Sequence, residues 1–217
     1  MSPESRRPLE WAVATHTRNG RASTLLVDRS SGLLIGVRQV LSPYFDERPT
    51  GTAPELLVVH GISLPPGEFG GPWIDRLFTG TLPWAAHPYF KQIEGLRASA
   101  HALIRRDGEI VQYVPFGQRA WHAGKSAYGG RTACNDFSIG IELEGTGETP
   151  YTDAQYDSLA ALVSALLGAY PSLSAQHIAG HSDIAPGRKT DPGPCFDWPR
   201  FRSLLAGRVP KQGAAGG

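Results

Sequence analysis

The most regular pattern along the chain is a helical one between residues 152 and 170. Thr152 and Gln155 form a T-x-x-Q capping box, and Pro171 ends the periodic stretch. Behind the box, apolar residues recur at helical spacing: Tyr156, Leu159, Ala160, Val163, Leu166, Leu167 and Tyr170. The pattern predicts a scaffold helix whose apolar stripe packs on a sheet. A shorter helix is expected from Asp197 to Ala206, with Gly207 after it.

Two apolar stretches predict internal strands. Residues 56–59 are continuously apolar, which is typical of a strand buried on both faces, and polar His60 follows directly. Residues 138–145 alternate strictly, with Glu142 and Glu144 on the polar side. That side either opens onto solvent or forms the floor of a cleft. A buried carboxylate there would need a cation or a proton as its partner.

Three further segments complete the expected framework. Residues 33–40 are apolar around Gly36 and predict an edge strand, while 99–106 and 109–114 predict a hairpin. The Gly- and Pro-rich segment 63–84 holds one short amphipathic piece, 72–79. Because it follows His60, this segment could be a lid or wall of a cleft, or a packed loop that does not move.

Composition indicates one globular α/β domain. The chain has 217 residues, of which 41% are hydrophobic and 19% charged, and its net charge of +1 favours neither nucleic acid nor a membrane surface as partner. Residues 1–30 lack periodicity and are expected to be an extension that could be disordered. The domain is expected over 31–207, with a flexible tail at 208–217.

The cellular location is expected to be the cytoplasm. The first thirty residues show no signal-peptide pattern, and no window approaches the ~18 apolar residues of a membrane span. Cys134 and Cys195 are far apart in the sequence and form no metal-binding pair. Free thiols in a reducing compartment are expected, with a single disulfide between them as the alternative.

The segment from His181 to Pro194 carries the strongest chemical signal. Within eleven residues it offers His181, Lys189 and Asp191, in a stretch too rich in Pro and Gly for a helix or central strand. One interpretation is a metal site with a fixed positive charge beside it. The other is a rigid surface loop whose Asp caps a turn and whose Lys is solvated.

Adding His60 gives two imidazoles and one carboxylate as candidate ligands. Three such ligands with one position left open are the pattern of catalytic zinc, whereas structural zinc usually takes four ligands, mostly Cys. Glu142 is suited to move a proton to a leaving amine, and Lys189 to stabilise an oxyanion. The set predicts metal-assisted amide hydrolysis.

Two aromatic residues each allow two interpretations. His101 lies among Ala100, Ala102 and Leu103, which favours a packed or supporting residue over a ligand. Trp121 precedes His122-Ala123-Gly124 in a loop. It is either a stacking platform for a sugar or a peripheral core aromatic.

Several long motifs, in order, resemble the AmpD family of cytoplasmic 1,6-anhydro-N-acetylmuramyl-L-alanine amidases. The resemblance covers roughly residues 36–205. The segments that carry it are 57–60 (LVVH), 64–73 (LPPGEFGGPW), 99–101 (SAH), 119–124 (RAWHAG), 135–145 (NDFSIGIELEG) and 181–194 (HSDIAPGRKTDPGP).

The resemblance implies a peptidoglycan-recognition-type fold, in which helices flank a central mixed β-sheet and one zinc ion lies in a surface groove. His60, His181 and Asp191 match the ligand positions. Glu142 matches the acid/base position, and Lys189 the residue that stabilises the tetrahedral intermediate.

The implied reaction is cleavage of the lactyl-to-L-alanine amide of 1,6-anhydro-muropeptides during peptidoglycan recycling. Trp121 would border the sugar pocket and Arg97 would meet the stem peptide. A small muropeptide is the expected partner, and a monomer the expected state. Two alternatives stay open: a muropeptide-binding sensor without turnover, and a general wall amidase, which would require export.

Two positions depart from the family pattern. Gly61 stands where relatives usually have Asn, so an amide that could contact the sugar is missing. Ala133 replaces a basic residue often found before the Cys-Asn-Asp motif, so contacts to the peptide are expected to differ.

Overall fold

A six-stranded mixed sheet forms the centre of the molecule. The structure is a computed structural model that describes residues 14–18 and 21–208. The strand order is β13-β6-β12-β7-β8-β4, in which only β7 and β8 pair antiparallel. The strands are β4 (Arg38–Gln39), β6 (Leu56–Ile62), β7 (Ala102–Ile104), β8 (Ile110–Gln112), β12 (Ser138–Glu144) and β13 (Ile178–Gly180).

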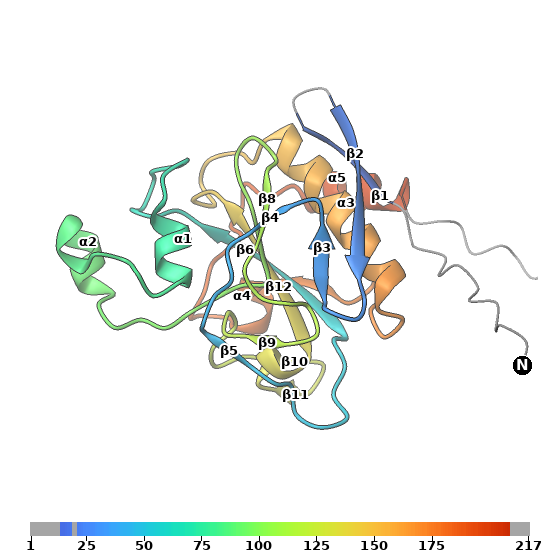
Figure 1. Cartoon of the computed structure of the whole chain (residues 1–217), viewed down its shortest axis with the longest axis horizontal. Coiled ribbons are helices and arrows are strands. Elements are labelled where there is room, and N and C mark those ends of the chain that lie inside the picture. The colour runs from blue at the N-terminus through green and yellow to red at the C-terminus, as the bar shows by residue number, and fades with distance from the viewer. Residues whose placement is uncertain (1–13, 19–20, 209–217) are drawn as a thin grey trace, which may run out of the picture.

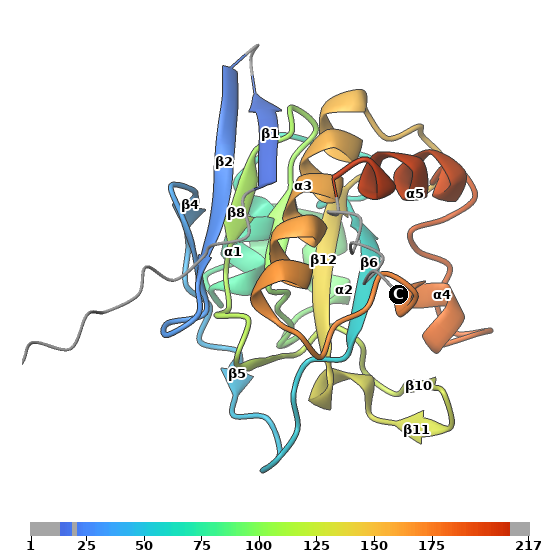
Figure 2. The same ribbon diagram turned by 90° about the vertical axis from the view of Figure 1, so that its right-hand side faces the viewer.

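Helices cover both faces of this sheet, which confirms the expected fold class. On one face lie α3 (Asp153–Ala169) and α5 (Trp198–Ala206), and on the other α1 (Trp73–Phe78), with α2 (Pro88–Gln92) beyond it (Figure 1). Figure 2 shows α3 and α5 side by side in front of β12 and β6. No helix in the described ranges is long and apolar enough to cross a membrane.

The alternating side chains of β6 and β12 divide the core. Leu57 and Val59 point toward α3 together with Ile139, Ile141 and Leu143 of β12. Leu56 and Val58 point the other way, into a smaller cluster with Cys134 and Ile184. Both strands are therefore apolar toward α3, and their opposite faces carry the polar residues.

The two predicted helices form for the expected reasons. The Thr152 hydroxyl accepts a hydrogen bond from the Gln155 amide, and the Gln155 side chain accepts one from the Thr152 amide. Asp197 caps α5 by accepting from the Arg200 amide. Side-chain caps satisfy backbone donors that the first helical turn leaves without partners.

Segment 33–40 was predicted to be one edge strand but forms two short strands. Gly36, at φ +78°, divides it into β3 (Leu33–Ile35) and β4. Only β4 lies at the edge of the main sheet. The 99–114 hairpin is confirmed, since β7 and β8 pair antiparallel around Gly108 at φ +85°.

The domain also begins earlier than residue 31. Strands β1 (Ala14–Arg18), β2 (Arg21–Asp28) and β3 form an antiparallel sheet packed on α3. Leu25 and Val27 are 1% and 4% exposed and belong to the core around α3. The expectation of an extension over 1–30 is therefore wrong for 25–28, because buried apolar side chains tie this strand down. Residues 1–13 and 209–217 lie outside the described residues.

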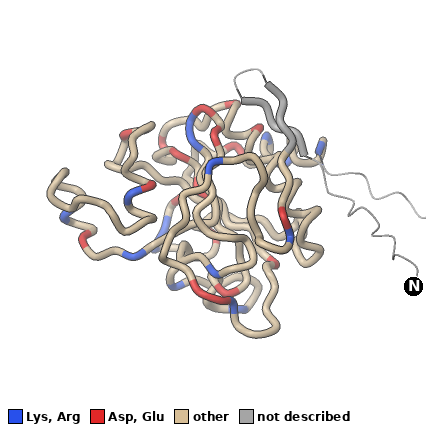
Figure 3. The backbone as a smooth tube through the Cα atoms, viewed as in Figure 1, with Lys and Arg blue, Asp and Glu red and all other residues tan. Residues whose placement is uncertain are grey.

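Short two-stranded pairs and turns complete the described chain. They are β5 (Phe45–Asp46) with β9 (Arg119–Ala120), β10 (Ala127–Tyr128) with β11 (Arg131–Thr132), and the 3-10 turns at Trp84–Ala86 and Cys134–Asp136. Acidic and basic residues are interspersed along the backbone (Figure 3). Cys134 and Cys195 are free thiols, as expected.

The N-terminal boundary leads to a stability prediction. Leu25→Ala should lower the free energy of unfolding by about 2–5 kcal/mol, because it removes buried methyl groups and leaves a cavity against α3. Ile35→Ala in the same small sheet is the control, since Ile35 is 51% exposed and should change stability by less than ~0.5 kcal/mol. Urea unfolding measures both. Equal effects would place residue 25 outside the folded domain.

Candidate metal centre and active site

The candidate ligands meet where parallel strands end. His60 lies near the carboxyl end of β6, and His181 follows the last residue of β13, which pairs with β6. Glu142 lies opposite His60 in the parallel register of β12 and β6, so both side chains point to the same face. Parallel strands present their carboxyl ends at one edge of a sheet, where ligands commonly bind.

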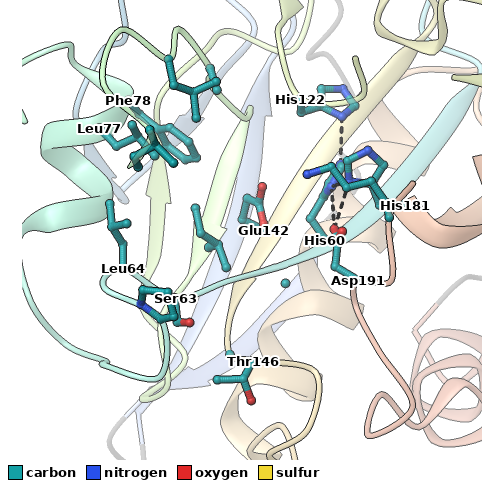
Figure 4. Close-up of a pocket in the computed structure, with 18 of the residues that line it drawn as sticks. His60, Ser63, Leu64, Leu77, Phe78, His122, Glu142, Thr146, His181 and Asp191 are labelled. Atoms are coloured by element: carbon teal, nitrogen blue, oxygen red, sulfur yellow. Dashed lines mark hydrogen bonds and ion pairs between the residues drawn. The ribbon is translucent and has the colours of Figure 1, made fainter. Parts of the chain in front are cut away.

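Three donor atoms converge at this edge (Figure 4). Nδ1 of His60 lies 3.0 Å from Nδ1 of His181, and Asp191 Oδ2 lies 3.2 Å and 3.1 Å from those two nitrogens. Tetrahedral zinc with bonds of about 2.0–2.1 Å requires ligand atoms about 3.3 Å apart. The donors have both the chemistry and the spacing for zinc.

Backbone contacts hold the Asp191 segment in place. The Ser182 amide donates to the Asp191 carbonyl at 2.9 Å, and the Tyr151 hydroxyl donates to the Pro192 carbonyl at 2.9 Å. Residues 181–184, expected to be irregular, form the single helical turn α4 (His181–Ile184). The Asp183 carboxylate accepts from the Gly180 amide at 2.7 Å and thereby caps this turn.

Burial and charge set the ionisation of the cluster. Burial lowers the pKa of His60 to about 4, with the Asp191 carboxylate acting in the opposite direction. Burial alone would raise the pKa of Asp191, but its close contacts with the imidazoles of His181 and His60 together hold it well below its ordinary value. Neutral imidazole and ionised carboxylate are the forms that bind a metal ion.

Glu142 lies beside the cluster in an unusual state. Its side chain is 9% exposed, and Oε2 has no hydrogen-bond partner among the described residues. Burial raises its pKa well above the ordinary value, and the Asp191 charge raises it further, while Lys189 acts in the opposite direction. A carboxyl group with a raised pKa is suited to accept and return a proton.

An open cavity of about 640 Å³ leads to these groups. Lys189 and half-buried Trp121 line it with the candidate ligands and Glu142. Apolar residues form its far wall: Leu64, Leu77, Phe78, Tyr89, Ile93 and Leu96. The polar face of β12 therefore forms the floor of a cleft at Glu142, one of the two expected alternatives.

Comparisons with known proteins agree with this geometry. A family model described as N-acetylmuramoyl-L-alanine amidase matches residues 50–194. The 1,6-anhydro-N-acetylmuramyl-L-alanine amidase AmpD of Escherichia coli K12 is 66% identical over 175 residues, which cover 81% of this chain and 95% of that protein. The chain belongs to the N-acetylmuramoyl-L-alanine amidase family.

Solved structures resemble the amidase as well. The crystal structure of a selenomethionine AmpD derivative matches with a TM-score of 0.80 and 65% identity, covering 83% of this chain and 99% of that one. AmpDh3 from Pseudomonas aeruginosa, in complex with anhydromuramic pentapeptide, matches with a TM-score of 0.53 and 30% identity, covering 75% and 64%. The expected family and fold are both confirmed.

Two predicted contact residues differ in their placement. Trp121 faces the cavity and stacks on Tyr44, with ring centroids 6.0 Å apart. Arg97 is exposed and does not line the cavity, although its neighbours Leu96 and Ala98 do. Its role in binding the stem peptide stays a prediction.

His122 belongs to the site as well, although its sequence pattern does not indicate it. Its Nδ1 lies 2.9 Å from Nε2 of His60, on the side of the ring away from the donor cluster. Burial first, and then the neighbouring His60, hold the pKa of His122 well below its ordinary value, so the ring is neutral. The only sequence signal was its position beside Trp121. His101 is a fully buried packing residue, as expected.

The raised pKa of Glu142 predicts a pH-dependent stability difference. Below about pH 4.5 the carboxyl group is protonated in both the folded and the unfolded chain, so it has no effect. Above that pH the unfolded chain releases the proton while the folded chain retains it. Wild-type stability should therefore fall relative to Glu142→Gln as the pH rises.

Urea unfolding of both proteins without metal, between about pH 4 and pH 8, measures this difference. The glutamine variant keeps the shape of the side chain but cannot ionise, so it isolates the contribution of this one group. A stability difference that stays constant over the range would show that Glu142 ionises equally easily in the folded and unfolded chains.

Proposed function

We propose that the chain is a zinc-dependent amidase. It cleaves the amide bond between the lactyl group of 1,6-anhydro-N-acetylmuramic acid and L-alanine in muropeptides, as a step of peptidoglycan recycling. One zinc ion would be held by His60, His181 and Asp191. The observation that carries the proposal is the position of Glu142, a buried carboxyl group with an unpaired oxygen, beside three metal donors at the floor of an open cavity.

Two residues of the chain would have separate roles in the reaction beside the zinc ion. When bound, zinc supplies a Lewis acid that polarises a carbonyl group and lowers the pKa of water. Glu142 takes a proton from the attacking water and later gives it to the amine of the departing L-alanine. The Lys189 ammonium faces the same cavity and stabilises the negative charge that develops on the carbonyl oxygen.

The reaction balances without a further reactant. A carbon–oxygen bond forms as water adds to the lactyl carbonyl carbon, and the carbon–nitrogen bond to L-alanine then breaks. The products are a lactyl carboxylate on the anhydro-sugar and a peptide with a free amino group. The apolar wall and Trp121 offer a surface for the anhydro-sugar, since aromatic faces pack well against sugar rings.

The site favours an enzyme over a muropeptide-binding sensor, because all three donors and Glu142 are present together. A monomer is part of the proposal, since one chain supplies every group of the site. Action in the cytoplasm is also part of the proposal. The proposed substrate is a small muropeptide, which agrees with the substrate in the name of the E. coli relative. A wall amidase would instead act on intact peptidoglycan.

Product analysis tests the reaction and its metal together. The purified protein, incubated with 1,6-anhydro-muramyl tripeptide, should release free peptide and anhydro-sugar, detected by mass spectrometry. A zinc chelator should abolish the release and added zinc should restore it, because the proposed reaction needs the metal ion that the three donors would hold. Tight binding without cleavage by zinc-loaded protein would identify a sensor, and cleavage of intact peptidoglycan a wall amidase.

Removing the proton carrier should separate chemistry from metal binding. Glu142→Gln is expected to retain zinc and to lower kcat by at least ~100-fold, the usual scale for loss of a general acid/base. His60→Ala and Asp191→Ala should instead lose zinc and activity together. Glu148→Gln, at an exposed glutamate on the cavity rim, is the matched control for kcat. Wild-type turnover in Glu142→Gln would reject the assignment.

Removing the lysine charge should affect the same step. Lys189→Ala is expected to lower kcat by about 100-fold or more with little change in KM, because an oxyanion forms only during the reaction. Lys125→Ala, which removes an exposed lysine outside this cavity, should keep the wild-type kcat. An effect of Lys189→Ala on KM alone would limit Lys189 to substrate positioning.

A further inference from the structure

A chain of hydrogen bonds runs from His60 into the protein interior. His60 Nε2 lies 2.9 Å from His122 Nδ1, and His122 Nε2 lies 3.2 Å from the Ser138 hydroxyl (Figure 4 shows the first contact). The Ser138 hydroxyl donates its only proton to the Cys134 carbonyl at 2.6 Å. The chain therefore ends at a backbone oxygen, which can only accept.

This end point determines which atom donates in each hydrogen bond of the series. Because the Ser138 proton points to the carbonyl, the hydroxyl oxygen must accept from His122 Nε2–H. With its proton at Nε2, the His122 ring presents a lone pair at Nδ1, which accepts from His60 Nε2–H at 2.9 Å. His60 is then left with a bare Nδ1, the atom that belongs to the donor cluster.

The imidazole of His181 is oriented by Ala123, the residue that follows His122 in the sequence. His181 Nε2 lies 3.2 Å from the Ala123 carbonyl oxygen, which can only accept, and 3.5 Å from Arg188 Nη2, so the nearer carbonyl favours a proton on Nε2 and a bare Nδ1. The Arg188 guanidinium donates to the same oxygen at 2.7 Å and holds it in place. Two adjacent residues, His122 and Ala123, thus contact the outer nitrogens of both candidate ligands.

One side chain anchors this dipeptide. The Asn135 side-chain oxygen accepts from the backbone amides of His122 and Ala123, at 3.1 Å and 2.8 Å. Gly140 on β12 leaves the space in which the His122 ring lies, since a Cβ at residue 140 would collide with that ring. Neither contact involves a reacting atom, so both residues act only through others.

We propose that His122 and the Ala123 carbonyl are positioning groups that hold His60 and His181 in the Nε2–H tautomer, with Asn135 and Ser138 fixing their places. This inference rests on the proposed zinc site. Partners of this kind orient metal-binding histidines, and their loss typically lowers metal affinity by about 10–100-fold.

The tautomer of His122 is the direct test. A long-range ¹H–¹⁵N NMR spectrum of the zinc-loaded wild-type protein should show His122 protonated at Nε2 and bare at Nδ1. Ser138→Ala removes the acceptor for that proton and should let the Nδ1–H form appear. A wild-type His122 protonated at Nδ1 could not accept from His60 and would overturn the proposal.

Zinc affinity, measured by competition with a chromophoric chelator, is the second test. His122→Leu should bind zinc about 10–100-fold more weakly than wild type, whereas His122→Asn, which keeps an acceptor near the position of Nδ1, should retain most of the affinity. The matched control is His101→Leu. It removes a buried imidazole whose ring lies 5.7 Å from that of His122 but which forms no hydrogen bond to a candidate ligand among the described residues.

The outcomes separate this inference from the proposed function. A wild-type protein without measurable zinc affinity would reject the zinc amidase itself. Normal wild-type affinity together with an unchanged His122→Leu variant would reject only the role of His122. Equal losses in His122→Leu and His101→Leu would mean that general packing, and not the hydrogen bond to His60, supports the metal site. Circular dichroism shows whether each variant is folded.

Discussion

The in-register pairing of β6 with β12 is the constraint on which the site depends. Because the strands are parallel and Glu142 lies opposite His60, a candidate ligand and a candidate proton carrier emerge side by side on one face. The other face of both strands is apolar and packs on α3. A shift of β12 by one residue against β6 would turn Glu142 into this core while His60 stayed on the site face, and an unpaired carboxylate there would be strongly destabilising.

Strand β12 buries two carboxyl groups, and the cost of burying their charge is avoided in two different ways. Glu144, 1% exposed, accepts hydrogen bonds from the Arg105 guanidinium at 3.1 Å and from the Gly70 amide at 2.7 Å. This contact also ties the loop after β6 to the sheet. Within the described part of the chain Glu142 forms no such ion pair, and its raised pKa favours the proton instead. The first arrangement supports structure, while the second leaves a group free for chemistry.

The two departures from the family pattern lie away from the donor cluster, one at the cavity and one beside a separate groove. Gly61 lies on its wall, and a side chain there would meet the Tyr151 hydroxyl, which holds the Pro192 carbonyl beside Asp191. Ala133 takes a left-handed conformation at φ 58° beside a separate groove that includes Arg188 and Ile184. Only the departure at Gly61 therefore touches the cavity, and neither departure replaces a candidate metal donor.

Residue pattern alone determined the local elements and the chemistry on offer: the 152–170 helix, the buried strand before His60, and a His, Lys and Asp set in one segment. These follow from periodicity, capping and ligand type, which depend on near neighbours in the chain. Tertiary structure decided the rest. Leu25 and Val27 joined the core only because α3 offers an apolar surface. His122 became a partner of His60 only because β12 has glycine at 140. His60 and His122 are 62 positions apart in the chain, and a local sequence pattern carries no information about such a contact.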